Sequence, residues 1–301
     1  MSTPTRPVLR YHGGKWRLAP WIISHFPAHR VYVEPYGGGA SVLIRKPRVY
    51  AEIYNELDGE IFNLFRAIRE RGEELRTLVE LTPYSRADFD LSFVRTDDAL
   101  EQARRTVVRS FMGFGGNLTR ANRDDSPQRT GFRRYSSTDR RATPAGDWRN
   151  WPDALVELID RLRGVFIENR DALLCMQEHD GPDTLHYVDP PYVHATRGFS
   201  CGGTKGGGSH RGYRFEMSDD DHRVMAAVLR SLSGYVVLSG YAHPLYDEEL
   251  FADWHRVERK HVADGARART EVLWLNPRCA TALDSRAPSL PLGGAAWSAP
   301  A

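Results

Sequence analysis

The segment VYVEPYGGGASVLIRKPRVYAEIYNE, residues 31–56, decides the fold. Two runs rich in β-branched and aromatic residues, 31–34 and 48–54, indicate short β-strands. Between them, the glycines at 37–39 form a turn that opens a short helical stretch. The order strand, glycine turn, helix, strand is typical of a parallel sheet with helices on its faces. The segment therefore predicts an α/β fold.

The rest of the chain extends this pattern. Further strands are expected at 164–168, 184–188, 234–239 and 271–275, and helices at 58–71, 222–231 and 244–251. Between the second and third strands, the sequence is helical at first and then loop-like through 113–152. We therefore expect a core domain of residues 1–58 and 163–278, an inserted mainly helical domain of residues 59–162, and a Pro-, Ala-, Ser- and Gly-rich disordered tail of residues 279–301.

Composition places the chain among ordinary globular proteins, with 41% hydrophobic and 27% charged residues. No apolar run approaches the length of a membrane span and the amino terminus lacks a signal-like apolar stretch, so we expect a cytoplasmic protein without membrane contact. Three widely spaced cysteines indicate unpaired thiols. The net charge is only +2, but residues 104–141 contain ten Arg against three Asp, a basic cluster that favours a nucleic-acid partner.

The glycine turn carries the first functional signal. Glycine lacks a Cβ, so backbone N–H groups and the helix amino terminus can approach a ligand closely. The turn lacks a third glycine, because Val42 stands at that position, and it lacks the Lys-Ser/Thr ending of a phosphate loop. Glu56, nineteen residues beyond Gly37, ends the next strand, where a carboxylate can accept hydrogen bonds from two ribose hydroxyls. This pair fits a dinucleotide and an adenosyl ligand equally well, and a strand-end carboxylate facing water is the plain alternative for Glu56.

The tetrapeptide Asp189-Pro190-Pro191-Tyr192 carries the second signal. It follows a predicted strand, at the sheet edge where open α/β folds place their active sites. The prolines fix the backbone and leave carbonyl oxygens free to accept hydrogen bonds. An Asp189 carboxylate and the Pro190 carbonyl could accept the two hydrogens of an exocyclic base amine, while Tyr192 offers a flat face for a base taken out of the duplex. Taken alone, the tetrapeptide is also a plausible rigid turn.

Several blocks, in this order along the chain, resemble the Dam-like, D12-class adenine-N6 DNA methyltransferases, particularly phage and prophage members. The blocks cover the first sixty residues and most of 165–277; they are RYHGGK at 10–15, VEPYGGGA at 33–40, YNELDGE at 54–60, IENRD at 167–171, DPPY at 189–192, LSGY at 238–241 and RTEVLWLNP at 269–277.

The resemblance implies a methyltransferase with a Rossmann-like sheet. Such an enzyme would transfer a methyl group from S-adenosylmethionine to adenine N6 in double-stranded DNA. The resemblance implies catalytic roles for Asp189, Pro190, Pro191 and Tyr192. It also implies cofactor contacts from Tyr11, Lys15, Glu34, Pro35, Gly37, Gly39, Glu56, Asp171 and Asp189. Lys15 would meet the methionine carboxylate and Asp171 the adenine ring. Glu56 departs from the Asp of many members, which leaves its ribose contact in doubt. Local capping or turn formation is the alternative role for each residue.

In this family the insertion recognises the target DNA, although the resemblance there is loose. Residues 113–135 mix glycines, Asn and Arg with aromatics, which suits a loop that enters a groove. Arginine can read guanine and asparagine can read adenine, but most arginines would contact phosphates. The candidate DNA-binding residues are Asn117, Arg120, Arg123, Arg129, Arg133 and Arg134. For any one of them, a solvated basic loop is the alternative.

Other functions remain open from the residues alone. Cytosine N4 or RNA amines would suit the same tetrapeptide. A nicotinamide-dependent dehydrogenase shares the glycine turn but leaves the tetrapeptide and the basic insertion unexplained. A catalytically silent DNA-binding module would require damaged motifs, and only Glu56 departs from the pattern. No His/Cys cluster or carboxylate cage is visible, so no metal is expected, and nothing demands more than a monomer.

Overall fold

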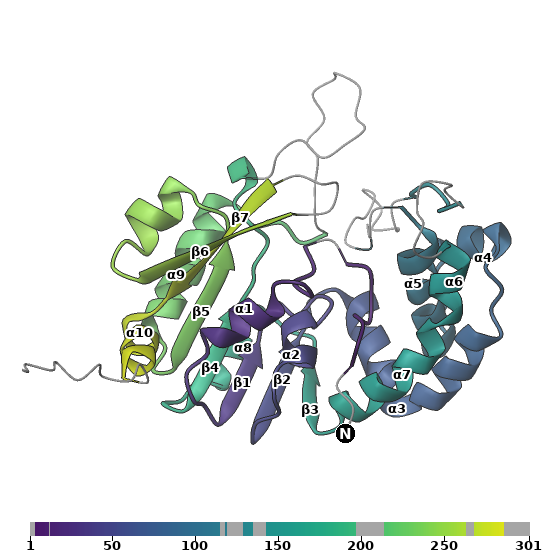
Figure 1. Cartoon of the computed structure of the whole chain (residues 1–301), viewed down its shortest axis with the longest axis horizontal. Helices are drawn as coiled ribbons and strands as arrows, with labels where there is room; N and C mark the ends of the chain where they lie inside the picture. Colours follow the sequence, from purple (N-terminus) through teal and green to yellow (C-terminus); the bar gives the residue numbers. More distant parts are fainter. Residues whose placement is uncertain are drawn as a thin grey trace, which may run out of the picture.

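The computed structural model of the protein describes residues 4–11, 13–114, 118, 129–134, 143–196, 214–262 and 268–285. Its centre is a seven-stranded sheet in the order β3-β2-β1-β4-β5-β7-β6 (Figure 1). Strands β1 to β5 are parallel, whereas β7 runs antiparallel to both of its neighbours. The strands are β1 (Val31–Glu34), β2 (Ala51–Asn55), β3 (Val165–Glu168), β4 (Thr184–Val188), β5 (Tyr235–Gly240), β6 (His255–Val262) and β7 (Ala268–Leu275). The expected α/β, Rossmann-like sheet is confirmed.

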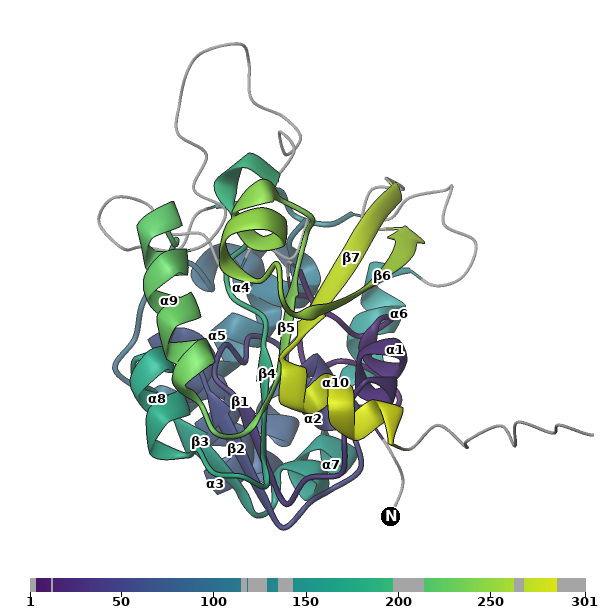
Figure 2. The same ribbon diagram turned by 90° about the vertical axis from the view of Figure 1, so that its left-hand side faces the viewer.

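Helices cover both faces of the sheet (Figure 2). On one face lie α8 (Ala172–Glu178) and α9 (Asp219–Ser231), with the π-helical turn η3 (Leu245–Leu250). On the other face lie α1 (Ala19–Ser24), α2 (Ser41–Arg45) and α10 (Pro277–Asp284). Strand β1 shows why two layers form: Tyr32 packs into the core beneath α1 and α2, and Val33 into the cluster beneath α8, because successive side chains of a strand point to opposite faces.

The described helices between β2 and β3 lie beside the β3 end of the sheet (Figure 1). They are α3 (Gly59–Glu80), α4 (Arg86–Leu91), α5 (Ala99–Met112), α6 (Pro144–Arg149) and α7 (Trp151–Leu162). Helices α3, α5 and α7 share one hydrophobic core with a face of the sheet. The buried Arg161 of α7 also donates to the carboxylate of Glu52 on β2, at 2.7 and 2.9 Å. These three helices are thus packed onto the sheet, and the treatment of residues 59–162 as a separate domain stays a prediction.

Several sequence-based boundaries were wrong, and β2, α9 and β7 begin at residues 51, 219 and 268. Helix α3 continues beyond residue 71, with a kink at Arg71 where Gly72 packs against Ile159. Part of the loop expected through 113–152 is helical, because α6 begins at a proline capped by Thr143. The tail expected to be disordered from residue 279 instead begins as α10, whose Cys279 is fully buried. Residues 286–301 lie outside the described part of the chain.

Strand β6 was missed altogether. Its sequence, HRVERKHV, is charged and has no apolar face, and it pairs only with β7 at the edge of the sheet. Charged residues are common in edge strands, where they oppose pairing with other chains. Of the helices within the described ranges, none is long and apolar enough to span a membrane.

Candidate active site

A cavity of about 370 Å³ opens at the carboxyl ends of the central strands. Residues that follow four neighbouring strands line it: Pro35 after β1, Glu56 after β2, Asp171 after β3 and Asp189 after β4. All nine residues expected to contact a cofactor line this cavity, as do Pro190 and Pro191. The volume falls in the range of small-molecule sites. Asp189 therefore shares one cavity with the glycine turn.

The glycine turn has steric reasons for its sequence. A Cβ on Gly37 would lie 2.2 Å from the ring of the buried Tyr54, and Gly38 has a φ of +48° and would meet the Tyr11 ring at 2.8 Å. The sequence motif singles out Gly37 and Gly39, whereas the positive φ falls on Gly38. The turn brings Tyr11 against the glycines, so the amino-terminal segment forms one wall of the cavity.

Two buried or half-buried carboxylates support this turn. Glu34 accepts hydrogen bonds from the Tyr32 hydroxyl (2.7 Å) and the Leu43 amide (2.9 Å), yet burial raises its pKa to about 8. Glu56 accepts from the Gly38 amide (2.7 Å) and the Asp58 amide (2.8 Å), and burial raises its pKa to about 7. Glu56 therefore stabilises the glycine turn by accepting the Gly38 amide, and it also lines the cavity.

Asp171 likewise serves two purposes. One of its carboxylate oxygens, Oδ1, accepts from the amides of Leu173 and Leu174 and so caps the amino terminus of α8. The same side chain lines the cavity. Local capping, the alternative role, is thus present in the structure and is compatible with ligand contact.

Asp189 faces the cavity beside Lys15. The Lys15 Nζ lies 3.0 Å from Asp189 Oδ2 and donates to the Gly13 carbonyl oxygen at 3.0 Å. Burial raises the pKa of Asp189 to about 6, although Lys15 opposes the rise. The structure therefore pairs Lys15 with the catalytic candidate, and a contact with a methionine carboxylate stays a prediction.

Tyr192 is not among the residues that line the cavity, and it is held by contacts with β5 and β7. Its hydroxyl donates to Glu271 of β7 and lies 3.3 Å from the Ser239 hydroxyl of β5. Its ring packs edge-to-face on Tyr241 at 4.7 Å between centroids. Glu271 and Ser239 lie within the sequence blocks 269–277 and 238–241, but the sequence gives neither residue a role, because their contact joins segments 32 residues apart.

A further wall of the cavity was missed. It is formed by Arg214, Phe215, Glu216 and Met217. Arg214 Nη1 pairs with Asp58, the residue that caps α3, at 2.9 Å. No motif marks these four residues; only their position between the tetrapeptide and α9 could have suggested them.

The candidate DNA-binding residues divide into two groups. Asn117, Arg120 and Arg123 lie outside the described residues. Arg129 is 66% exposed and Arg134 is exposed, whereas Arg133 is half-buried and lies 3.7 Å from Asp147, which also pairs with two arginines of the amino-terminal segment. Arg133 is thus paired with an acidic residue at a half-buried position. Arg129 also has an acidic neighbour, Asp90 at 3.5 Å, but its side chain is exposed.

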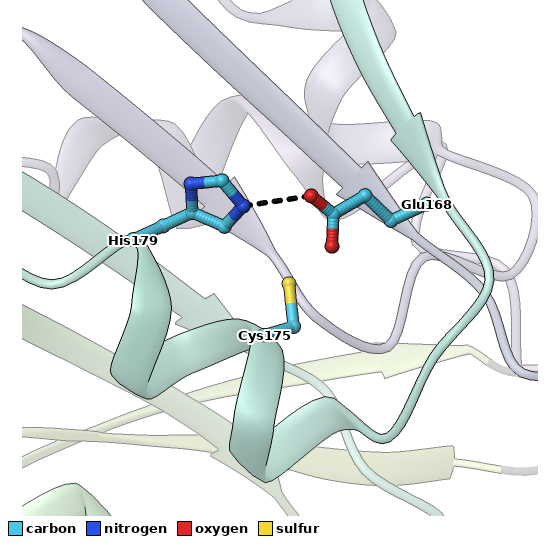
Figure 3. Close-up of side chains that lie close together, drawn as sticks. All are labelled: Glu168, Cys175 and His179. Atoms are coloured by element: carbon cyan, nitrogen blue, oxygen red, sulfur yellow. Dashed lines mark hydrogen bonds and ion pairs between the residues drawn. The ribbon is translucent and has the colours of Figure 1, made fainter.

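One His/Cys cluster does form, against the expectation from sequence. Figure 3 shows Glu168 of β3 with Cys175 and His179 of the α8 region, whose ligand atoms lie within 4.8 Å of one another. His179 Nε2 lies 2.8 Å from Glu168, and Arg170 lies 3.7 Å from the second oxygen of that carboxylate. Burial raises the pKa of Cys175 to about 12. The contact between His179 and Glu168 joins the end of α8 to β3, whereas the second oxygen of Glu168 is buried without a hydrogen-bond partner among the described residues.

The sheet order and the cavity at the strand ends are those of a Rossmann-like α/β enzyme, with the glycine turn and Asp189 in one cavity. The model of the D12 class N6 adenine-specific DNA methyltransferases matches residues 11–266, and the chain belongs to this family. This membership excludes the nicotinamide-dependent dehydrogenase.

A curated relative supports the same activity. It is the type II methyltransferase M1.LlaDCHI of Lactococcus lactis subsp. cremoris, which is 26% identical to this chain over 278 residues, or 84% of this chain and 87% of the relative. The chain is thus an enzyme that methylates DNA.

Proposed function

We propose that the protein transfers a methyl group from S-adenosylmethionine to the N6 amine of an adenine flipped out of double-stranded DNA. The observation that carries the proposal is the single cavity shared by the glycine turn, Glu56 and the Asp189-Pro190 turn. When bound, the cofactor supplies an electrophilic methyl group on a sulfonium, and the family match favours adenine in DNA over cytosine N4 or RNA.

The cavity fits such a cofactor by its chemistry. Carboxylates at Glu56 and Asp171 can accept hydrogen bonds from hydroxyl, amino and ammonium groups. Apolar side chains at Pro35, Leu173 and Phe215 offer surface for a nucleoside. Tyr11 and the glycine turn leave backbone groups near the ligand.

The residues of the tetrapeptide would prepare the amine. The lone pair of an adenine N6 is delocalised into the ring, so the amine is a poor nucleophile. Asp189 and the Pro190 carbonyl each accept one amine hydrogen, which favours a pyramidal nitrogen whose lone pair faces the cavity. The Asp189 carboxylate would take up the proton that leaves the nitrogen as the N–C bond forms and the methyl–sulfur bond breaks, with the sulfur leaving as a neutral thioether. Tyr192 stacks on the extruded base, which offsets part of the few kcal/mol that unstacking costs.

The proposal is tested by sequencing that detects modified bases in DNA from cells that express either the wild type or Asp189→Ala. We expect N6-methyladenine at one recurring sequence with the wild type and none with the variant. Methylation of cytosine alone would reject adenine as the target. Equal signals from both strains would reject Asp189 as the catalytic residue, and no new mark with the wild type would favour a silent DNA-binding module.

The pKa of Asp189 sets an expected pH dependence. Only the ionised carboxylate accepts the amine hydrogens and the proton, so kcat/KM for DNA should fall as pH drops through about 6, by about tenfold per unit below it. Because the pKa of Asp189 is raised, the fall in kcat/KM should begin at a higher pH than for an ordinary aspartate. Initial rates at limiting DNA between about pH 5 and about pH 8 measure it. A kcat/KM that stays flat down to about pH 5 would contradict a proton-accepting Asp189.

Exposed arginines of the insertion should contribute to DNA binding. Replacing Arg129 and Arg134 together with alanine should weaken DNA affinity and lower the slope of log affinity against log salt by about one unit for each phosphate that is no longer neutralised. Arg278→Ala is the control. Arg278 donates hydrogen bonds to the carbonyl oxygens of Ser233 and Pro182, which precede the amino-terminal ends of β5 and β4. An unchanged slope in the double variant would argue against phosphate binding there.

A further inference from the structure

Glu271 stands at the centre of a polar group behind the Asp189-Pro190-Pro191-Tyr192 turn. It accepts hydrogen bonds from the Tyr192 hydroxyl and from the Ser239 hydroxyl, the latter at 2.7 Å. Its carboxylate also lies 3.7 Å from the Lys15 Nζ and 3.6 Å from the His261 Nε2. One carboxylate on β7 therefore contacts residues from the amino-terminal segment, the tetrapeptide, β5 and β6.

The register of the sheet explains how Glu271 reaches this place. The last described pair between β5 and β7 joins Gly240 to Val272. Glu271 is the next residue of β7, so it projects one position past the end of β5, at the edge where the parallel strands end. Because β7 is antiparallel to β5, β7 begins at the carboxyl ends of the parallel strands, where the active-site turns lie.

Lys15 links Glu271 to the catalytic candidate. Its Nζ lies 3.0 Å from Asp189, 3.7 Å from Glu271 and 4.8 Å from the centroid of the Tyr192 ring. The ammonium thus sits between two carboxylates and close to the ring that Glu271 holds by its hydroxyl. Displacing Glu271 would release both Lys15 and Tyr192.

Glu271 is charged at this buried position. The residue is only 1% exposed, and an unpaired charge there would be costly. Although burial opposes ionisation, Lys15, the neighbouring His261 and the hydrogen bonds from Tyr192 and Ser239 hold the pKa of Glu271 below its ordinary value. Packing alone could be provided by an apolar side chain, so the retained charge indicates a role in orienting polar partners.

We propose that Glu271 is a positioning residue for methyl transfer, which fixes the Tyr192 ring through its hydroxyl and holds Lys15 beside Asp189. This inference rests on the proposed function, since it assigns the base-stacking role to Tyr192 and the amine-binding role to Asp189. Orienting groups of this kind act by keeping the reacting geometry within a fraction of an ångström. Glu271 itself touches neither the cavity nor the reacting atoms.

Glu271→Gln is the sharpest test, because the amide keeps the size of the side chain and one acceptor oxygen but removes the charge. We expect kcat to fall at least about tenfold while KM for S-adenosylmethionine changes less than about threefold. Glu258→Gln is the matched control: the same change on the neighbouring strand β6, at a half-exposed side chain paired with Arg256. It should leave both constants unchanged.

The acidic limb of kcat/KM gives a second readout that a purely structural residue would not move. The charged groups that act on Asp189 are Lys15 and Glu271, and Asp189 also interacts with Glu34. Lys15 lowers the pKa of Asp189 by more than Glu271 raises it, so release of Lys15 in Glu271→Gln should shift the limb to higher pH. Full kcat and a limb that does not move to higher pH in Glu271→Gln would overturn the inference.

Tyr192→Phe keeps the inference testable if Glu271→Gln does not fold. It removes only the hydroxyl that Glu271 binds and leaves the ring, so kcat should again fall at least about fivefold. A Tyr192→Phe enzyme as fast as the wild type would show that anchoring the ring is unnecessary and would overturn the inference. These results are read only against an active wild type; a wild type without methyl transfer would reject the proposed function itself.

Discussion

Asp189→Ala is expected to reduce kcat for DNA methylation at least about a thousandfold, which corresponds to about 4 kcal/mol of transition-state stabilisation. The variant lacks the group that accepts an amine hydrogen and the departing proton, and the neighbouring Glu271 cannot replace it, because Glu271 is occupied by Tyr192 and Ser239. Binding of S-adenosylmethionine should remain within a few-fold of the wild type. Rates of methyl transfer into unmethylated DNA and equilibrium titration of the cofactor measure the two effects.

The fold should tolerate this change. Without Asp189, Lys15 keeps Glu271 at 3.7 Å and the Gly13 carbonyl at 3.0 Å, so its charge is not left without partners. Asp220→Ala is the matched control, because Asp220 is 90% exposed on α9. Retention of more than a tenth of the wild-type rate in Asp189→Ala would count against its role. Parallel loss of cofactor binding would point to a disturbed cavity instead.

The arrangement of the cavity could be predicted from sequence because local patterns determine it. The strands at 31–34 and 184–188 are short apolar runs, and both have the bounds expected from sequence. In a parallel sheet, carboxyl ends meet at one edge, so Pro35, Glu56, Asp171 and Asp189 had to lie close together once the strands were placed. Nothing beyond strand order and turn chemistry was needed for this part.

Contacts between distant segments could not be predicted in the same way. Glu271 and Tyr192 are 79 residues apart, and their hydrogen bond depends on an antiparallel β7 beside β5. That strand pairs with β6, whose charged sequence carries no strand periodicity, so the pattern gave no sign of the edge of the sheet. The pairing of Glu168 with His179 is likewise a product of how α8 returns to β3. Such contacts follow from topology, which local periodicity does not specify.

The carboxylates of the cavity show how a local motif acquires its electrostatics from the fold. Glu34, Glu56 and Asp189 all have raised pKa values, at about 8, 7 and 6, and in each case burial is the largest cause. Sequence indicates an acidic residue at each position but not how much water reaches it. Each carboxylate also meets groups that oppose this rise in pKa, and those of Asp189 include the Lys15 ammonium at 3.0 Å.

Gly37→Ala is expected to lower the free energy of unfolding by about 2 kcal/mol or more and to abolish the stabilisation that S-adenosylmethionine confers. A Cβ there would lie 2.2 Å from the Tyr54 ring and 2.8 Å from the Asn55 carbonyl oxygen. Tyr54 cannot move aside, because it is fully buried, its hydroxyl donates to the Gly38 carbonyl oxygen at 2.7 Å, and its ring packs on Phe65 at 4.4 Å. The backbone of the turn must shift instead.

Gly59→Ala provides the matched control for this strain. Gly59 begins α3, and a Cβ there would meet nothing within 4 Å, so alanine should be neutral or slightly stabilising. Thermal unfolding of the wild type and both variants, with and without S-adenosylmethionine, separates the two glycines. A Gly37→Ala variant with the melting temperature of Gly59→Ala, and with the same rise in melting temperature on adding S-adenosylmethionine, would show that the glycine turn does not hold the ligand. A displaced backbone at residues 37–39 could not preserve a binding site built from it.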